Sequence, residues 1–178
     1  MPQRPARRRP ARTRPAPLAG IRLLVLDVDG VLTDGRLRYG AAGELDKTFH
    51  VRDGYGLKAV QAAGIAVAVI SGRQSPAVSR RCQELGISHA HQGIDDKAAV
   101  FAQLLAALGI SARQCACVGD DGPDLPLLAR AGLAVAVADA HPEALALAHR
   151  RTRLPGGAGA VREVCDWLLA ARRRGRRP

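Results

Sequence analysis

Carboxylates, a hydroxyl and a lysine follow the ends of apolar segments in this chain of 178 residues. Asp27 and Asp29 come directly after an apolar run, Ser71 and Asp120 end two later runs, and Lys97 follows two acids. Crowded carboxylates repel one another and raise each other's pKa, so they require a cation. Oxygen ligands alone favour Mg²⁺, and a lysine beside a hydroxyl can hold a tetrahedral anion. The pattern predicts phosphoryl transfer.

The order of these residues also predicts a division of roles. Asp27, at the tip of its run, is the predicted nucleophile that forms an aspartyl phosphate. Asp29 is predicted to protonate the leaving alkoxide and then to deprotonate the attacking water. Ser71 and Lys97 complete the catalytic set. The expected ligands of Mg²⁺ are Asp27, Asp29 and Asp120, with ligand-orienting acids behind them at Asp121 and Asp124.

Apolar runs of strand length alternate with helical stretches along the chain. The predicted strands cover residues 21–28, 65–70, 87–91, 115–118 and 133–137, with a weaker one at 149–152. Strand and helix alternation predicts an α/β fold with a Rossmann-like, doubly wound parallel sheet. Ligands bind beyond the carboxyl ends of such strands, which is where the acids lie. Residues 34–50 interrupt the alternation and predict a β-hairpin inserted after the first strand.

The basic charge belongs to the ends of the chain. Residues 1–20 hold six Arg and no acid, and residues 172–178 hold five Arg and no acid, which together equal the net charge of +11. We therefore predict disordered basic tails at 1–20 and 172–178 around one neutral domain at 21–171. Nucleic-acid binding by the tails is the less favoured interpretation. There is no apolar run of membrane-spanning length and no secretory h-region, which predicts a cytoplasmic protein without membrane contact.

Four motifs in order resemble the phosphatases of the haloacid dehalogenase (HAD) superfamily: DVDGVLTDG, Ser71, Lys97 and GDDGPD. The further stretches HVRDGYG, AVADAHP and GGAGAVREVCD are similar to the family of 3-deoxy-D-manno-octulosonate 8-phosphate (KDO 8-P) phosphatases. The resemblance spans residues 21–170. It implies a Mg²⁺-dependent hydrolase of a small sugar phosphate in lipopolysaccharide synthesis, without a cap domain.

The same resemblance implies the substrate contacts and the assembly. The implied contacts are Asp29, His50, Val51, Arg52, Asp53, Gly54, Lys58, Gly72, Arg73, Arg81 and Lys97. Lys58 stands where relatives often have Arg, so a point charge replaces a bidentate group there. The family also implies a homotetramer built through the 34–50 hairpin, with a neighbouring subunit covering each open site.

Two expectations concern single segments. The glycine-rich residues 156–159 are expected to act as a mobile lid, and deletion of residues 154–178 is expected to alter kcat and KM while the fold survives. Asp53 beside Gly54 is expected to cap its own helix at the N-terminus.

Two alternative functions remain open. The first is a phosphatase for a nine-carbon sialic-type acid 9-phosphate, built on the same motifs. The second is a non-catalytic HAD-like module that drives oligomerisation, although such a module would not need the complete set of Asp27, Asp29, Lys97 and Asp120.

Overall fold

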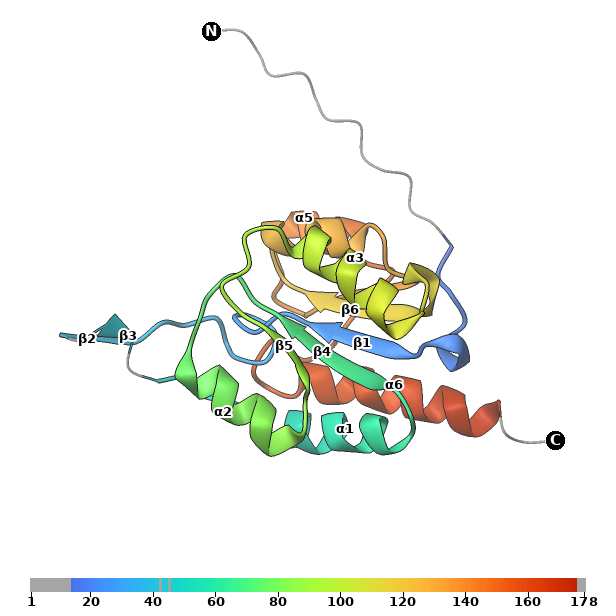
Figure 1. Ribbon diagram of the computed structural model, residues 1–178, viewed down its shortest axis with the longest axis horizontal. Coiled ribbons are helices and arrows are strands. Elements are labelled where there is room, and N and C mark those ends of the chain that lie inside the picture. The colour runs from blue at the N-terminus through green and yellow to red at the C-terminus, as the bar shows by residue number, and fades with distance from the viewer. Residues whose placement is uncertain (1–13, 42, 45, 176–178) are drawn as a thin grey trace, which may run out of the picture.

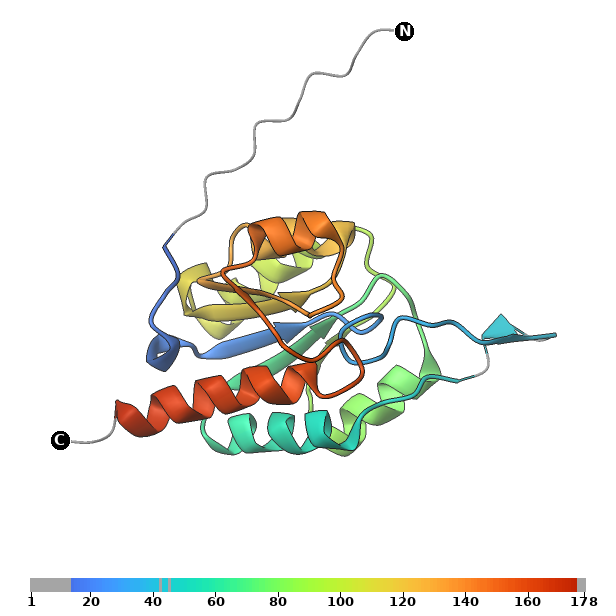
Figure 2. The ribbon, with the colours of Figure 1, turned by 180° about the vertical axis from the view of Figure 1, so that it is seen from behind.

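The chain folds around a parallel sheet of six strands with helices on both faces, as Figures 1 and 2 show. The computed structural model describes residues 14–41, 43–44 and 46–175. The strands lie in the order β5-β4-β1-β6-β7-β8, and every neighbouring pair is parallel. Their bounds are Leu23–Leu26 (β1), Ala66–Ile70 (β4), His89–His91 (β5), Cys115–Gly119 (β6), Leu133–Ala136 (β7) and Arg150–Arg151 (β8). The predicted α/β fold is confirmed.

Helices α1, α2 and α6 cover one face of the sheet, and α3, α4 and α5 lie on the other (Figure 1). The helices are Val51–Ala62 (α1), Pro76–Leu85 (α2), Lys97–Leu108 (α3), Leu125–Leu128 (α4), Pro142–Leu147 (α5) and Ala160–Arg174 (α6). Short 3-10 turns occupy Leu18–Gly20 (η1), Ala112–Gln114 (η2) and Gly122–Asp124 (η3). All four residues of β1 are buried, as a central strand covered on both faces requires.

The direction of winding reverses at β1. The chain moves from β1 to β4 on one side, and β6 later adds on the other side of β1. The carboxyl end of β1 is therefore the topological switch point, which is where ligands bind in open α/β sheets. No helix in the described ranges has the length and apolar character needed to span a membrane.

The inserted hairpin stands off the sheet (Figures 1 and 2). Its paired strands are only Tyr39–Gly40 (β2) and Gly43–Glu44 (β3), which are antiparallel. The predicted hairpin is thus confirmed, but most of residues 34–50 forms two extended legs. The leg that follows β3 ends at His50. The His50 ring accepts the Arg52 N–H at 3.2 Å, so His50 is the N-cap of α1.

Both predicted tail boundaries are wrong within the described residues. The Ala16 N–H donates to the Gly132 carbonyl at 2.7 Å, and η1 packs beside α6. Arg172 donates to the carbonyls of Ala63 and Ile21 at 3.2 and 3.1 Å, so it joins the end of α1 to the start of β1. The Arg172 guanidinium donates hydrogen bonds to these two carbonyls, a structural role that counting charges in the sequence does not reveal. Residues 1–13 and 176–178 lie outside the described residues, and disorder there stays a prediction.

Asp53 caps a helix other than its own. Its side chain is almost fully buried and its Oδ1 accepts the N–H of Arg162, in the first turn of α6, at 2.7 Å. The residue preceding α6 is Gly159, which has no side chain with which to cap that end. The expectation that Asp53 begins its own helix is therefore wrong, because His50 caps α1 and Asp53 lies in its first turn.

Replacing Asp53 by Ala is expected to lower the free energy of unfolding by about 1–2 kcal/mol, the usual value of an N-cap acceptor. Asp53→Asn should cost less, because its amide oxygen can still accept the Arg162 N–H. Urea unfolding followed by circular dichroism measures both. Wild-type stability in the Ala variant would contradict the capping role.

Candidate active site

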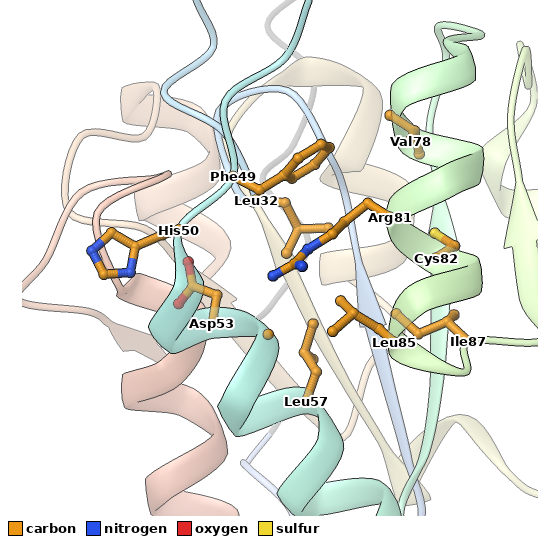
Figure 3. A pocket seen from close by; sticks show the side chains of 11 residues that line it. Leu32, Phe49, His50, Asp53, Leu57, Val78, Arg81, Cys82, Leu85 and Ile87 are labelled. Carbon is orange, nitrogen blue, oxygen red and sulfur yellow. The ribbon is translucent and has the colours of Figure 1, made fainter.

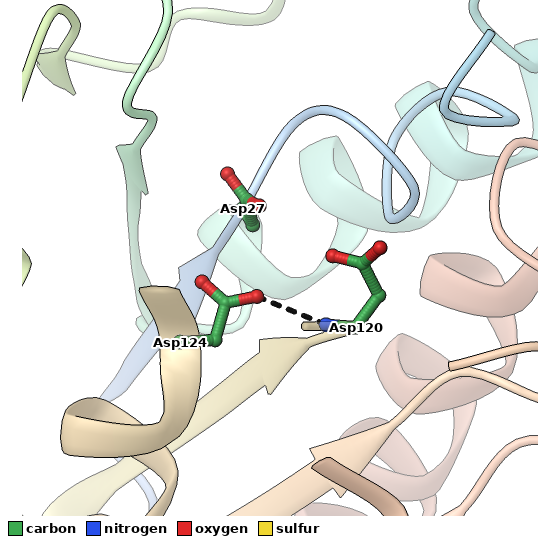
Figure 4. Close-up of side chains that lie close together, drawn as sticks. All are labelled: Asp27, Asp120 and Asp124. Atoms are coloured by element: carbon green, nitrogen blue, oxygen red, sulfur yellow. Dashed lines mark hydrogen bonds between the residues drawn. The ribbon is translucent and has the colours of Figure 1, made fainter. Parts of the chain in front are cut away.

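Three carboxylates converge at the carboxyl ends of β1 and β6 (Figure 4). Asp27 follows β1 directly, Asp120 follows β6, and Asp124 ends η3. One oxygen from each of the three lies within 4.8 Å of the others. The backbone pairing of β1 with β6 brings this about, since the Asp27 N–H donates to the Val118 carbonyl at 3.2 Å.

The buried side chain of Lys97 neutralises part of the negative charge of this cluster. Its ammonium lies 2.9 Å from Asp27 Oδ1 and 2.8 Å from Asp124 Oδ1, and its side chain is 3% exposed. Asp96 caps α3 by accepting the Ala99 N–H, so Lys97 is the first helical residue and extends toward the sheet edge. The structure therefore brings together Asp27, Lys97, Asp120 and Asp124, as the sequence predicts.

Asp124 also shapes the loop that presents Asp120. Its Oδ2 accepts the Asp120 N–H at 2.9 Å, the contact drawn in Figure 4, while its Oδ1 holds Lys97. Asp121 behaves differently from the prediction that it orients the metal ligands. Its side chain is 63% exposed and accepts the Gly122 N–H at 2.6 Å, which caps η3.

Gly30 keeps the two loops close together. It has a positive φ of 87°, and a Cβ there would collide with the Asp120 carboxylate. A larger residue would therefore displace the Asp120 carboxylate from its place beside the β1 loop. The positive φ and this close contact together favour glycine at the end of the DVDG motif.

A second group of charged side chains surrounds Asp29 and includes a residue of the hairpin. Lys47 lies 2.5 Å from Asp29 Oδ1, and Arg73 Nε lies 3.9 Å from Oδ2. Ser71 follows β4 and is buried, and its Oγ accepts the Arg73 N–H at 3.3 Å. The sequence analysis missed Lys47, because an isolated lysine in a polar loop carries no spacing that marks it.

The remaining implied substrate contacts lie around α1 and α2. Arg81 points toward α1 in an apolar pocket shared with Asp53, and this pocket contains a cavity of about 10 Å³ (Figure 3). The Arg81 guanidinium lies 3.2 Å from Glu84 and over the ring of Phe49. On the outer surface are Val51, which is 76% exposed, and the exposed residues Arg52, Lys58 and Gly72. His50 and Gly54 stand at the start of α1.

The glycine-rich segment packs its backbone on the loop that follows Asp29. The Gly157 N–H donates to the Val31 carbonyl at 3.1 Å, and the Gly156 N–H donates to Asp139 Oδ1 at 2.9 Å. A Cβ on Gly156 would collide with the Gly30 carbonyl, so the close approach needs glycine. Helix α6 buries Val161, Val164, Cys165 and Leu168 completely, which argues against survival of the fold after deletion of 154–178.

Burial raises the pKa of both central acids. The pKa of Asp27 rises to about 6, mainly through desolvation and then through the charge of Asp124. The pKa of Asp120 rises to about 7 by desolvation and by its acidic neighbours Asp124 and Asp27. One lysine does not balance three acids, and the donors are all oxygen atoms, so the residues fit a hard divalent cation.

Without metal, the protein is expected to lose stability as pH rises from about 5 to 8. The folded-state pKa values of Asp27 and Asp120 lie above the ordinary 3.8, so the folded chain binds more protons than the unfolded chain in this range. Deprotonation therefore disfavours folding. Thermal unfolding in EDTA at several pH values measures the trend. Added Mg²⁺ should raise Tm more at pH 8 than at pH 5, and equal shifts would contradict the assignment.

The sequence of this chain is similar to those of known phosphatases, in agreement with the geometry of the site. The family model of haloacid dehalogenase-like hydrolases matches residues 90–155. The KDO 8-P phosphatase of Yersinia pestis is 50% identical over 153 residues, covering 86% of this chain and 82% of that protein. The enzyme of the same name from Escherichia coli K12 is 51% identical over 156 residues, covering 88% and 83%.

Solved structures that resemble this chain are also KDO 8-P phosphatases. The crystal structure of the Yersinia pestis phosphatase superposes with a TM-score of 0.85 at 49% identity and covers 88% of this chain and 85% of that one. The Moraxella catarrhalis phosphatase, solved with a magnesium ion, a phosphate ion and KDO, has a TM-score of 0.85 at 44% identity, with coverage of 88% and 90%.

Proposed function

We propose, because this chain belongs to the KDO 8-P phosphatase family of the HAD superfamily, that it hydrolyses KDO 8-P to KDO and phosphate with Mg²⁺. The observation that carries the proposal is the buried Lys97, held between Asp27 and Asp124 at the switch point of the sheet. A module that serves only oligomerisation has no need of a desolvated lysine among three acids, because burying such a group is costly.

In the proposed reaction, Asp27 attacks phosphorus and becomes an aspartyl phosphate. Asp29 protonates the departing C8 alkoxide and then takes a proton from the water that hydrolyses phospho-Asp27. Lys97 holds Asp27 in place and neutralises charge on the transferring group, and Ser71 offers a hydroxyl to its oxygens. Asp27 and Asp120 are the proposed side-chain ligands of the metal, with Asp124 beside them. The Asp29 carboxylate, which the sequence analysis also expected as a ligand, is paired with Lys47 instead. When bound, Mg²⁺ offsets the repulsion between these acids and the phosphate.

Substrate selection is proposed to come from residues outside this centre. Arg73 lies beside Asp29 and is proposed to contact an anionic group of the substrate at this edge of the sheet. The stretch from His50 to Gly54, with Lys58 and Arg81, stays a proposed contact region for the sugar acid.

We also propose a homotetramer assembled through the 34–50 hairpin, acting in the cytoplasm in lipopolysaccharide synthesis. The hairpin projects from the body and exposes Leu37 and Tyr39, two large apolar side chains. Exposed apolar side chains on a projecting element favour association. Light scattering on the full chain tests this, and a monomer at micromolar concentration would contradict it.

The function is tested by phosphate release from KDO 8-P with Mg²⁺ and with EDTA. We expect turnover only with the metal, and a higher kcat/KM for KDO 8-P than for a nine-carbon sialic-type acid 9-phosphate. A preference for the nine-carbon substrate would transfer the proposal to that alternative. Absence of turnover on both substrates would contradict the phosphatase function.

A further inference from the structure

The hairpin reaches back to the active site through Lys47. The Lys47 side chain is 2% exposed, although it belongs to an extended leg of a projecting hairpin. Its ammonium lies 2.5 Å from Asp29 Oδ1. Burying a lysine is costly unless its charge is compensated, so this placement indicates a specific role for the pair.

The other oxygen of Asp29 faces a second cation that the hairpin also holds. Arg73 Nε lies 3.9 Å from Asp29 Oδ2, and its Nη2 donates to the Tyr39 hydroxyl at 2.8 Å. Tyr39 belongs to β2, and Lys47 follows β3. Both legs of the hairpin therefore act on one carboxylate, one directly and one through Arg73.

We propose that Lys47 is a positioning residue that fixes the Asp29 carboxylate toward the leaving oxygen, with Tyr39 and Arg73 restraining its other side. This proposal rests on the proposed function, in which Asp29 transfers the proton. Asp27 is held by β1 and by Lys97, whereas Asp29 lies two residues beyond Asp27 in the loop. A general acid must lie within hydrogen-bonding reach of the oxygen it protonates. Because Asp29 lies in a loop and not on a strand, its orientation depends on its side-chain partners, and Lys47 is one of them.

The test compares two substrates that differ in their need for an acid. KDO 8-P loses an alkoxide, which must be protonated, whereas p-nitrophenyl phosphate loses a stabilised phenolate. Hydrolysis of phospho-Asp27 also uses Asp29 and is the same for both substrates, so the first half-reaction is measured alone, as release of KDO or p-nitrophenolate in a single turnover with enzyme in excess. We expect Lys47→Met to lower the single-turnover rate of KDO release by roughly 10²-fold, the low end for general acid catalysis. The single-turnover rate of p-nitrophenolate release should fall by less than roughly 5-fold, the usual effect of losing one hydrogen bond.

Asp29→Asn is the reference and Arg130→Met is the control. Arg130 is exposed and precedes the amino end of β7, away from the hairpin and from the acids, so its replacement should change neither substrate's kinetics. If Asp29→Asn shows the substrate difference and Lys47→Met lowers both single-turnover rates equally, the positioning role is overturned. If Asp29→Asn lowers both single-turnover rates equally, the acid role itself fails, which is a failure of the proposed function.

Tyr39→Phe gives an independent measurement if Lys47→Met does not fold. Tyr39 is largely exposed, so loss of its hydroxyl leaves the core intact. We expect a loss of roughly 5-fold in the single-turnover rate of KDO release, without a matching loss in p-nitrophenolate release, because one hydrogen bond to Arg73 is removed. Equal rates for wild type and Tyr39→Phe on both substrates would overturn the restraint by the hairpin.

Discussion

Asp27→Asn is expected to abolish phosphate release from KDO 8-P, with kcat falling by roughly 10⁴-fold or more, as removal of a catalytic nucleophile does in other enzymes. An amide oxygen is too weak a nucleophile to displace the alkoxide and form a phosphoryl enzyme. The change also removes the negative charge of one of the three carboxylates whose oxygens lie within 4.8 Å of one another at the proposed metal site. Phosphate release under saturating Mg²⁺ and substrate measures the effect.

A measurement of Tm distinguishes this loss of activity from unfolding of the variant. Burial raises the pKa of Asp27 to about 6, so its charged form is costly at pH 8 and a neutral Asn is easier to bury. In EDTA at pH 8, Asp27→Asn should therefore have a Tm equal to or above that of the wild type. Asp166→Asn makes the same change on the exposed side of α6 and should keep full activity. Activity above about 1% of wild type in Asp27→Asn would exclude it as the nucleophile.

The sheet and the acids at its edge could be predicted because both follow from local patterns. β1 and β7 are buried along their full length, and the sequence shows each as an uninterrupted apolar run. Parallel pairing then forces the residues that follow β1 and β6 to meet, which places Asp27 beside Asp120. Lys97 was predictable as the first residue of a helix with a clear N-cap and a glycine at its end.

Contacts between distant segments could not be predicted in this way. Lys47 reaches Asp29 only because the hairpin leg returns to the carboxyl end of β1, and no periodicity in the sequence encodes that return. Asp53 caps α6, which begins more than a hundred residues later, because Gly159 leaves that helix without a side-chain acceptor. Arg172 was assigned to a tail by its charge, whereas its guanidinium bonds two carbonyls at the edge of the core.

Lys97→Met is expected to reduce both stability and activity, and the two losses can be separated. The ammonium is buried between Asp27 and Asp124, with Asp120 close by. Its removal leaves acids without a counter-charge, and breaking a buried ion pair from one side costs about 3–5 kcal/mol. The deficit should be largest at pH 8 in EDTA and smaller near pH 5, where the acids with raised pKa values take up protons.

Adding Asp124→Asn to this variant distinguishes charge balance from catalysis. The double variant removes one uncompensated acid, and the Asn side-chain oxygen can still accept the Asp120 N–H. Urea unfolding should therefore recover part of the lost stability. Phosphate release should stay roughly 10²–10³-fold below wild type, because the cation that stabilises the transferring phosphoryl group is still missing.

Lys58→Met, the same change at an exposed position, should alter stability by less than about 0.5 kcal/mol. If the double variant recovered activity together with stability, Lys97 would serve the fold alone and the proposed catalytic role would be wrong.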